Sequence, residues 1–208
     1  MNLIIRRMAP SLAEDYFDFF DNRAFTDHSP YYPCYCNFLN MSEERRQKEV
    51  FDQVSFYGGG VEGRKMAARR SAELMVAQGE IQGYLAYDSE IPVGWCNAND
   101  KCSYFFPADD DFCIAKYTSD ENCPKKIKSV VCFEIAPEYR GKGIATALLK
   151  QVCDDAKKEH YDIVESYPVI HKSFEPYDFT GPLHIYEKAG FVRIVRQGNV
   201  LVMQKDLT

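Results

Sequence analysis

The sequence predicts a mixed α/β fold whose sheet is mostly antiparallel and includes one parallel crossover. A buried strand at about 128–136 runs through a short glycine-containing turn into an amphipathic helix, and a second apolar strand follows at about 163–167. This strand–helix–strand order is typical of a parallel crossover unit. Two further segments, at about 82–98 and 191–204, each hold two short apolar runs around a polar turn, the pattern of an antiparallel hairpin. Helices are therefore expected to flank a central sheet.

The bulk composition is that of a globular protein of moderate size. The chain has 208 residues, of which 46% are hydrophobic and 27% are charged. No repeat, low-complexity tract or Pro/Gly/Ser-rich linker divides it. We therefore expect one domain over residues 1–208, with looser or inserted segments at about 27–78 and 99–126.

The first half of the chain alternates helices with irregular segments. The expected elements are a strand at about 3–8, a helix at about 12–24 with Ser11 as N-cap, an ordered aromatic loop at 27–38, a helix opened by Ser42 and a helix at about 62–78. Three glycines at 58–60 separate the last two helices. The stretch at about 99–126 is polar and irregular, and we expect an excursion there.

The helix after the glycine-containing turn has the clearest pattern in the sequence. Ile144, Leu148, Val152 and Ala156 repeat every four residues, so they form an apolar stripe for packing on a sheet. A shorter helix is expected at about 182–189, where Gly190 would end it. The final hairpin, with strands at about 191–196 and 200–204, turns at residues 197–199.

Charge and cysteine usage limit the classes of partner and compartment. The net charge of −6 argues against nucleic acid as the main partner. No apolar run is long enough to cross a bilayer, and the N-terminal run is too short for a signal peptide, so we expect a cytoplasmic protein without membrane contact. The eight cysteines are scattered without zinc spacing, so we expect no metal site. A homodimer is compatible with the sequence.

The turn between the buried strand and its helix has the chemistry of a phosphate site. Arg140-Gly141-Lys142-Gly143 stands at a helix N-terminus, where free backbone amides and the helix dipole attract anions. The glycines allow close approach to the backbone, and the two cationic side chains add positive charge. The spacing fits neither the Walker pattern nor the dinucleotide-binding pattern. A glycine-containing helix start that binds no ligand is the alternative.

A resemblance favours the ligand-binding interpretation. The segment Ile135 to Ala145 resembles the acetyl-coenzyme A signature of the GNAT superfamily, [RQ]-x-x-G-x-[GA], with Arg140, Gly143 and Ala145 in the three defined places. Tyr186-Glu187-Lys188-Ala189-Gly190-Phe191 resembles the second landmark of that superfamily, Y-x-x-x-G-F. The hairpin containing Ile91-Pro92-Val93-Gly94-Trp95 resembles the paired strands before the signature. The resemblance covers roughly residues 80–205, and the first strand and helix agree with it.

The resemblance implies a fold, a co-substrate and roles for individual residues. It implies a splayed parallel strand pair that admits the pantetheine arm of acetyl-coenzyme A, and a signature turn whose amides bind the pyrophosphate. The cofactor-binding residues implied here are Ile135, Arg140, Gly141, Lys142, Gly143, Ile144, Ala145 and Thr146. Tyr186 matches a tyrosine that protonates the departing thiolate; the alternative is that it packs its helix on the sheet. Phe179 stands where many members carry an asparagine that contacts coenzyme A.

A proton acceptor for the attacking amine is expected on the strand before the turn. Glu134 is our first choice, because an acid on an otherwise apolar strand requires a reason. The alternative is a glutamate that is simply paired with lysine or arginine. Glu165 and His171 are the next candidates, whereas His28, His160 and His184 are expected to be ordinary surface or cap residues.

The acceptor pocket is expected to involve the aromatic loop. Tyr31, Tyr32, Tyr35 and Phe38, with Trp95 from the hairpin, are candidate pocket walls, and Asp27 or Asp178 would suit an amine. Alternatively, the loop packs its own cluster. We therefore expect an N-acetyltransferase that moves acetyl from acetyl-coenzyme A to a primary amine of a small molecule by direct attack in a ternary complex. A protein lysine or N-terminus acetyltransferase and a non-catalytic coenzyme A-binding regulatory module are the alternatives.

Overall fold

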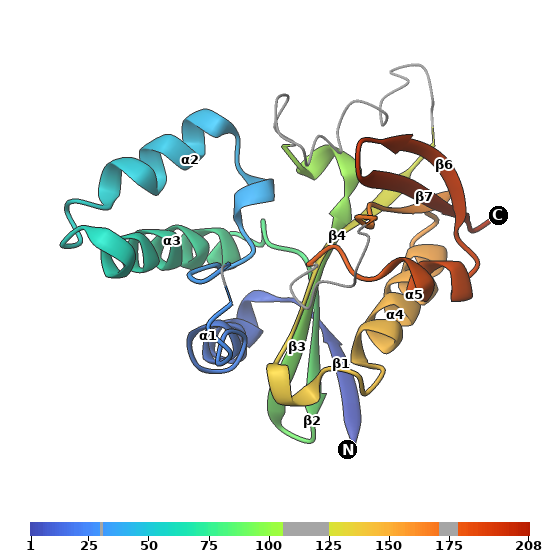
Figure 1. Cartoon of the computed structure of the whole chain (residues 1–208), viewed down its shortest axis with the longest axis horizontal. Coiled ribbons are helices and arrows are strands. Elements are labelled where there is room, and N and C mark those ends of the chain that lie inside the picture. Colours follow the sequence, from blue (N-terminus) through green and yellow to red (C-terminus); the bar gives the residue numbers. More distant parts are fainter. Residues whose placement is uncertain (30, 106–124, 171–178) are drawn as a thin grey trace.

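A seven-stranded sheet forms the centre of the protein (Figure 1). The computed structural model describes residues 1–29, 31–105, 125–170 and 179–208. The strands are β1 (Leu3–Arg7), β2 (Gly83–Asp88), β3 (Ile91–Asp100), β4 (Ile127–Ile135), β5 (Ile163–Ser166), β6 (Val192–Gln197) and β7 (Val200–Asp206), in the spatial order β1-β2-β3-β4-β5-β7-β6. All neighbours are antiparallel except β4 and β5, which are parallel. The predicted fold class is confirmed.

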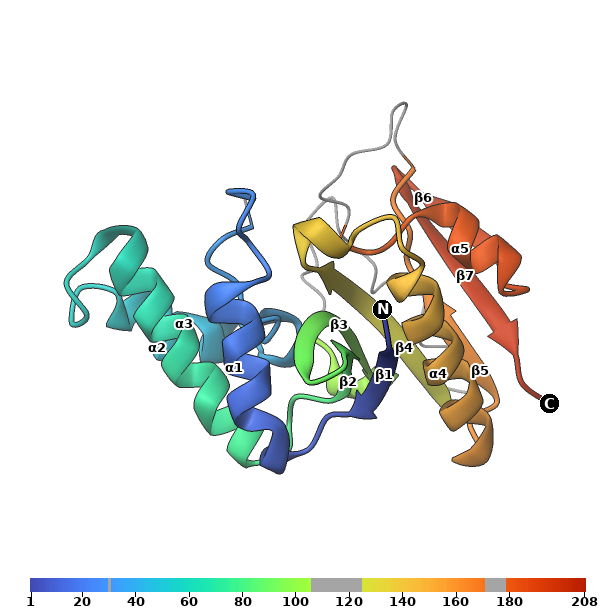
Figure 2. The same ribbon diagram turned by 90° about the horizontal axis from the view of Figure 1, so that it is seen from below.

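Helices cover the two faces of this sheet. The helices are α1 (Ala13–Asn22), α2 (Glu43–Glu49), α3 (Gly60–Ala77), α4 (Ile144–Lys158) and α5 (Leu183–Lys188). Figures 1 and 2 show α1, α2 and α3 together on one side and α4 and α5 on the other. The N-terminal helical layer and the C-terminal helical layer are therefore separated by the sheet.

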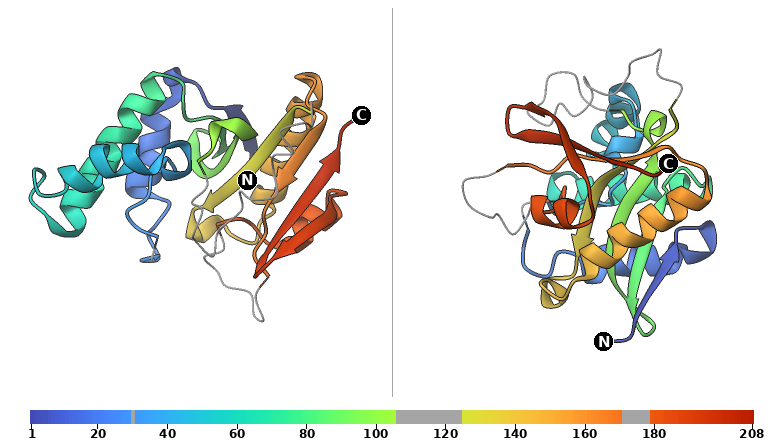
Figure 3. Two further views of the ribbon diagram at one scale, coloured as in Figure 1. Left: turned by 90° about the horizontal axis from the view of Figure 1, so that it is seen from above. Right: turned by 90° about the vertical axis from the view of Figure 1, so that its right-hand side faces the viewer.

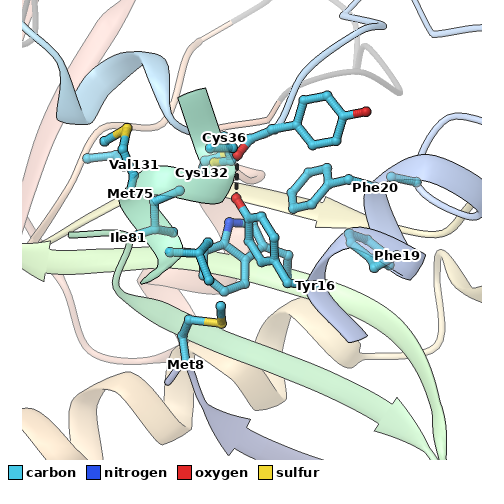
Figure 4. Packing of buried hydrophobic residues seen from close by; sticks show 14 of the residues in the cluster. Met8, Tyr16, Phe19, Phe20, Cys36, Met75, Ile81, Val131 and Cys132 are labelled. Carbon is cyan, nitrogen blue, oxygen red and sulfur yellow. Dashed lines mark hydrogen bonds between the residues drawn. The ribbon is translucent and has the colours of Figure 1, made fainter. Parts of the chain in front are cut away.

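The face toward α1 and α3 is packed mainly by aromatic side chains. Four aromatic residues of α1 are buried, and the ring of Tyr16 meets the fully buried indole of Trp95 edge-on, with centroids 5.0 Å apart. Figure 4 shows Tyr16, Phe19 and Phe20 on one side of this cluster and Cys36 and Cys132 at its end. The Tyr16 hydroxyl donates a hydrogen bond to the backbone carbonyl of Tyr35, which ties the aromatic loop to α1.

The opposite face is covered by the apolar stripe of α4. Ile144, Leu148, Val152 and Ala156 are all buried, as the four-residue repeat predicts. Gly94 of β3 lets this helix approach the sheet, because a Cβ at that position would lie 3.1 Å from Ile144 and 2.9 Å from Ile135. The start of α4 is thereby held against the centre of the sheet.

The parallel pair β4–β5 separates toward one end of the sheet. Its register runs from Ile127↔Ile163 to Val130↔Ser166, where β5 ends, while β4 continues five residues further to Ile135. Beyond the separation the amide of Phe133 donates to the carbonyl of Phe179, 2.5 Å away. Figure 3 shows the C-terminal β6–β7 hairpin (red) on the side of the molecule away from α2 and α3.

Several boundaries differ from those that the sequence predicts. Ser11 is not an N-cap, because it lies inside a 3₁₀ turn at Pro10–Leu12 that precedes α1. Ser42 does cap α2, accepting a hydrogen bond from the amide of Arg45. The expected excursion begins later than residue 99, because β3 continues to Asp100. Most of that excursion, residues 106–124, lies outside the described residues.

Candidate functional site

The turn before α4 presents backbone amides to open space. Gly141 and Gly143 have φ angles of +74° and +82°, a left-handed conformation that glycine adopts readily, and a Cβ at either position would meet no atom within 4 Å. The first helical hydrogen bond of α4 runs from Ala147 to Gly143. The amides of Ile144, Ala145 and Thr146 therefore have no helical carbonyl before them, as at any helix N-terminus. This geometry suits an anion.

A cavity of about 500 Å³ opens beside this turn, between the end of β4 and the segment before α5. Its described lining residues are Ser29, Tyr31, Phe133, Glu134, Ile135, Tyr139, Arg140, Gly141, Gly143, Ile144, Ala145, Thr146, Phe179, Gly181, Pro182, His184 and Ile185. The cavity thus brings together the separated end of β4, the signature turn and the aromatic loop. Of the eight predicted cofactor-binding residues, Lys142 alone is missing from this described lining, and its ammonium lies 4.8 Å from the ring centroid of Tyr139.

Glu134 places a carboxyl group in the wall of this cavity. Its side chain is 12% exposed, and burial raises its pKa to about 7, although the Arg140 guanidinium opposes that shift. Nη2 of Arg140 lies 3.3 Å from a carboxylate oxygen of Glu134. The glutamate is therefore both paired with arginine and poised to exchange a proton near neutral pH.

Arg140 contacts three partners rather than pointing freely into solvent. Besides Glu134, its Nη1 donates to Asp27, 2.5 Å away, and its Nε donates to the carbonyl of Ile135, 3.0 Å away. The guanidinium thus joins β4 and the loop after α1 at the edge of the cavity. Asp27, which the sequence singles out only as an acid that would suit an amine, contacts the signature arginine.

Tyr186 lies behind the cavity wall and not on its surface. The side chain is fully buried, its hydroxyl donates to the carbonyl of Thr180 at 2.6 Å, and burial raises its pKa well above the usual value. The hydroxyl lies near Gly181, which lines the cavity, since a Cβ there would be 3.2 Å from the hydroxyl oxygen. This placement agrees with the packing role, and proton donation stays a prediction.

The aromatic candidates for the acceptor pocket separate into two groups. Tyr31 lines the cavity and meets Phe179 edge-on, with centroids 5.2 Å apart. Trp95 and Tyr35 are instead buried in the cluster under α1, so our placement of them at the pocket is corrected. Tyr32 and Phe38 contact Phe25 and Phe51 respectively and are not among the described lining residues. The alternative that most of the loop packs in a cluster away from the pocket therefore fits its three side chains Tyr32, Tyr35 and Phe38.

The other candidate acids and bases lie elsewhere. Glu165 is fully buried and accepts hydrogen bonds from Tyr167 and Gln204, both at 2.6 Å, so it belongs to a buried network. His171 and Asp178 lie outside the described residues. His28 and His160 are exposed, as expected, whereas the exposed His184 stands at the cavity. The described residues contain no cluster of three metal-ligating side chains.

Sequence reasoning missed several lining residues. Ser29, Tyr139, Gly181, Pro182, His184 and Ile185 all contribute to the cavity, and none was predicted there. The segment from Phe179 to Pro182 gave a usable signal, because it departs from the family pattern directly before α5. Ser29 gave none, since its place depends on how the loop after α1 crosses to the end of β4.

Comparison with known proteins agrees with this arrangement. Residues 80–193 match the sequence model described as the acetyltransferase (GNAT) domain. No curated protein matches the chain in sequence. No described helix is long and apolar enough to span a membrane.

Several solved structures share the fold at low sequence identity. The NatC complex bound to Gag peptide and CoA has a chain that is 15% identical, with full coverage of both chains and a TM-score of 0.54. The PaiA N-acetyltransferase of Thermoplasma acidophilum, in complex with coenzyme A, is 14% identical over 99% of both chains, with a TM-score of 0.52. A GNAT-family acetyltransferase of Streptococcus pneumoniae is 13% identical over 98% of both chains, with a TM-score of 0.51. Since the family model matches more than half of the chain, this protein belongs to the GNAT family of acetyltransferases.

Proposed function

We propose that this protein transfers the acetyl group of acetyl-coenzyme A to a primary amine of a small molecule, by direct attack in a ternary complex. The observation that carries the proposal is one cavity that joins the glycine turn at the start of α4 to the carboxyl group of Glu134. The first feature suits a pyrophosphate and the second suits proton removal from an amine. A coenzyme A-binding module without activity would not need the second feature.

The chain's own residues fit coenzyme A. The amides at the start of α4, from Gly141 to Thr146, would hold the pyrophosphate, because the space beside both glycines is open. The apolar side chains of Phe133, Ile135 and Ile185 line the cavity next to this turn and suit an extended pantetheine arm. Arg140 would contribute positive charge at the mouth of the site, although its Nε and Nη1 already donate hydrogen bonds to Ile135 and Asp27.

Glu134 would accept the proton of the attacking amine. Bound acetyl-coenzyme A supplies an activated thioester carbonyl. An amine attacks such a carbonyl only in its neutral form, so a base must remove the ammonium proton. A carboxyl group with a pKa of about 7 is half ionised at neutral pH and is more basic than an ordinary glutamate. Burial in the cavity wall is what supplies this basicity.

Tyr186 would donate a proton to the departing thiolate if its hydroxyl turned from the Thr180 carbonyl toward the cavity beside Gly181. Its hydroxyl lies near Gly181, which lines the cavity, since a Cβ at Gly181 would be 3.2 Å from the hydroxyl oxygen. The raised pKa makes the phenol a weaker acid than usual. We therefore expect a modest contribution, because a thiolate leaves without full protonation.

The shape of the acceptor side supports a small molecule as the acceptor, and its charge supports a cationic amine. Tyr31 and Phe179 meet over the cavity, and Ser29 completes this wall from the loop after α1. A volume of about 500 Å³ is within the range of small-ligand pockets and is shared between two substrates. Asp27 and Glu134 give the acceptor side acidic character, and the net charge of the chain is −6. Both favour a cationic amine over nucleic acid.

A cytoplasmic location is part of the proposal. The six cysteines within the described residues are all free thiols, and four of them are buried. Free thiols are the rule in reducing compartments.

A panel assay tests the proposed reaction. Purified protein is incubated with acetyl-coenzyme A and individual amines, including polyamines, amino sugars, aromatic amines and amino acids, while free coenzyme A thiol is measured. We expect turnover with a small primary amine and none with its tertiary analogue. A parallel panel of peptides with free or blocked N-termini tests the alternative substrate class. Turnover with peptides alone would assign a protein substrate, and binding of acetyl-coenzyme A without turnover in either panel would refute the enzymatic proposal.

A further inference from the structure

The guanidinium of Arg140 is shared unequally between two carboxylates from distant parts of the chain. Nη1 lies 2.5 Å from Asp27 Oδ2, whereas Nη2 lies 3.3 Å from Glu134 Oε1. Asp27 precedes Arg140 by 113 residues and comes from the loop after α1. Nε of Arg140 is bonded to the carbonyl of Ile135, which fixes the plane of the group. The arginine therefore leans toward Asp27 and makes the longer contact with Glu134.

The balance of charge in this trio is incomplete. One cation faces two acids whose side chains are 24% and 12% exposed, for Asp27 and Glu134 respectively. The second oxygen of Asp27, Oδ1, is buried and has no hydrogen-bond partner in the part of the chain that the structure describes. Arg140 is thus the one hydrogen-bond partner of the Asp27 carboxylate among the described residues. The charge of Asp27 opposes ionisation of Glu134, and its hold on Arg140 weakens the largest of the contacts that favour ionisation, the other being a backbone hydrogen bond at Ile135.

From this geometry we propose that Asp27 is a positioning residue that acts through Arg140 to keep Glu134 basic. By holding Nη1, Asp27 draws the guanidinium away from Glu134, so that the ionised carboxylate of Glu134 is a stronger base and takes the proton of an amine more readily. This inference rests on the proposed role of Glu134 as proton acceptor. It gives the loop after α1 a role in the reaction that the signature motif does not contain.

The other titratable groups near Glu134 include thiols, and the phenols of Tyr31 and Tyr139 and one imidazole line the same cavity. Cys34 and Cys132 are held neutral, since burial raises the pKa of Cys34 to about 12 and a hydrogen bond with Cys36, together with burial, raises that of Cys132 well above its usual value. The pKa of Cys36 is lowered by its hydrogen bond with Cys132. Cys36 and Cys132 lie next to each other in Figure 4. His184 lines the same cavity from α5. Of these groups, an ionised Cys36 would act on Glu134 in the same direction as Asp27.

Direct titration of Glu134 tests the proposal without any substrate. The protein is labelled with ¹³C at the glutamate side-chain carboxyl, and the Glu134 signal is assigned by its loss in Glu134→Gln. We expect Asp27→Asn to lower the pKa of Glu134 by about one unit, a tenfold change in its acid dissociation constant, because the opposing charge is gone and Arg140 is released. Asp27→Ser should act in the same direction and serves if the amide variant is unstable. Asp27→Glu, which keeps the charge, should restore the wild-type midpoint.

Two matched variants make the test specific. Asp18→Asn removes an acid from a comparable ion pair, Asp18–Arg23 at 2.8 Å, near the end of α1, the helix that precedes Asp27, and should leave the pKa of Glu134 unchanged. Cys36→Ser removes the competing thiol and should also leave it unchanged. The proposal is overturned if folded Asp27→Asn and Asp27→Ser titrate as wild type does, or if Cys36→Ser accounts for the shift instead.

The pH profile of kcat/KM separates this inference from the proposed function. If both hold, the acidic limb of the profile moves to lower pH in Asp27→Asn by the same amount as the NMR midpoint. If the NMR midpoint shifts but the acidic limb of the kcat/KM profile does not move, the effect of Asp27 on Glu134 is supported. The same result would show that Glu134 is not the base. An unshifted midpoint overturns the link whatever the kinetics show.

Discussion

The chemistry of this site depends on how a few buried charges are compensated. Glu134 loses hydration in the cavity wall and regains only part of that stabilisation from Arg140, which also serves Asp27. A fully paired carboxylate would be a poor base, and an unpaired one would be costly to bury. The shared arginine gives an intermediate state in which the proton is exchanged near neutral pH.

Replacing Glu134 by glutamine tests its role as base. We expect wild-type kcat/KM to rise through about pH 7, where Glu134 loses its proton, and Glu134→Gln to lack that rise. The loss at neutral pH should be about 10²–10⁴-fold, the usual contribution of a general base. Alkaline pH should restore part of the activity, because more amine is then already neutral. If steady-state kinetics show an equal loss of kcat/KM at every pH from 6 to 9, the role of Glu134 is structural.

Removing the Tyr186 hydroxyl tests proton donation separately from packing. Tyr186→Phe keeps the ring in its buried place between Phe133 and Phe191 and deletes only the hydrogen bond to Thr180. We expect unchanged acetyl-coenzyme A binding and a kcat lower by about 10²-fold, the low end for an acid catalyst, because burial makes this phenol a weak acid. A kcat within a factor of about two of wild type would leave Tyr186 with packing alone.

Among the elements, those with local patterns were predictable from sequence. The four-residue repeat of α4 and the glycines before it predict both the helix and an exposed turn at its start, and the structure has both. The hairpin β2–β3 and the separation of β4 from β5 also agree with expectation. The position of Trp95 under α1 could not be predicted from the sequence. The alternation of a strand shows that successive side chains face opposite sides of the sheet, but it does not show which helices cover each side. Trp95 faces α1 and is buried there.

A bulky side chain at the start of α4 tests the turn as the pyrophosphate site. Gly143→Trp should abolish measurable binding of coenzyme A by calorimetry, because the indole would occupy the open space that the phosphates require. Gly79→Trp is the matched control: its φ angle of +71° is close to the +82° of Gly143, it also has open space, and it lies at the end of α3 away from this cavity. Both variants carry similar backbone strain of about 1 kcal/mol. Equal loss of binding in the two would point to strain rather than occlusion.

Over the whole molecule, the sheet brings the N-terminal helical layer to a site built from the second half of the chain. The family model begins at residue 80, so it contains Glu134 and Arg140 but not Asp27, Ser29 or Tyr31. The contact between Asp27 and Arg140 exists because α1 packs on Trp95 of β3 and directs its following loop toward the end of β4. A contact over 113 residues depends on tertiary packing and has no local sequence pattern, so it could not be predicted.

The stability of the whole protein should record the cost of ionising Glu134. Its pKa is raised from 4.5 to about 7 in the folded state, so the folded protein holds this proton more tightly than the unfolded chain does. The corresponding stabilisation is complete below pH 4.5 and is lost as the pH rises to about 7, with a total on the order of 3 kcal/mol. Glu134→Gln has no such proton to lose. The difference in free energy of unfolding, variant minus wild type, should therefore grow by up to that amount between pH 4.5 and pH 7 and stay constant above about pH 8, as measured by urea unfolding. Asp18→Asn serves as the control. The pKa of the Asp18 carboxyl is lowered in the folded wild type, so the variant-minus-wild-type difference should fall, not grow, as the pH rises, and it should do so at lower pH.

A constant difference between Glu134→Gln and wild type over pH 4.5–7 would show that Glu134 is ionised in the folded protein throughout that range. Base catalysis by this residue at neutral pH would then lose its physical basis.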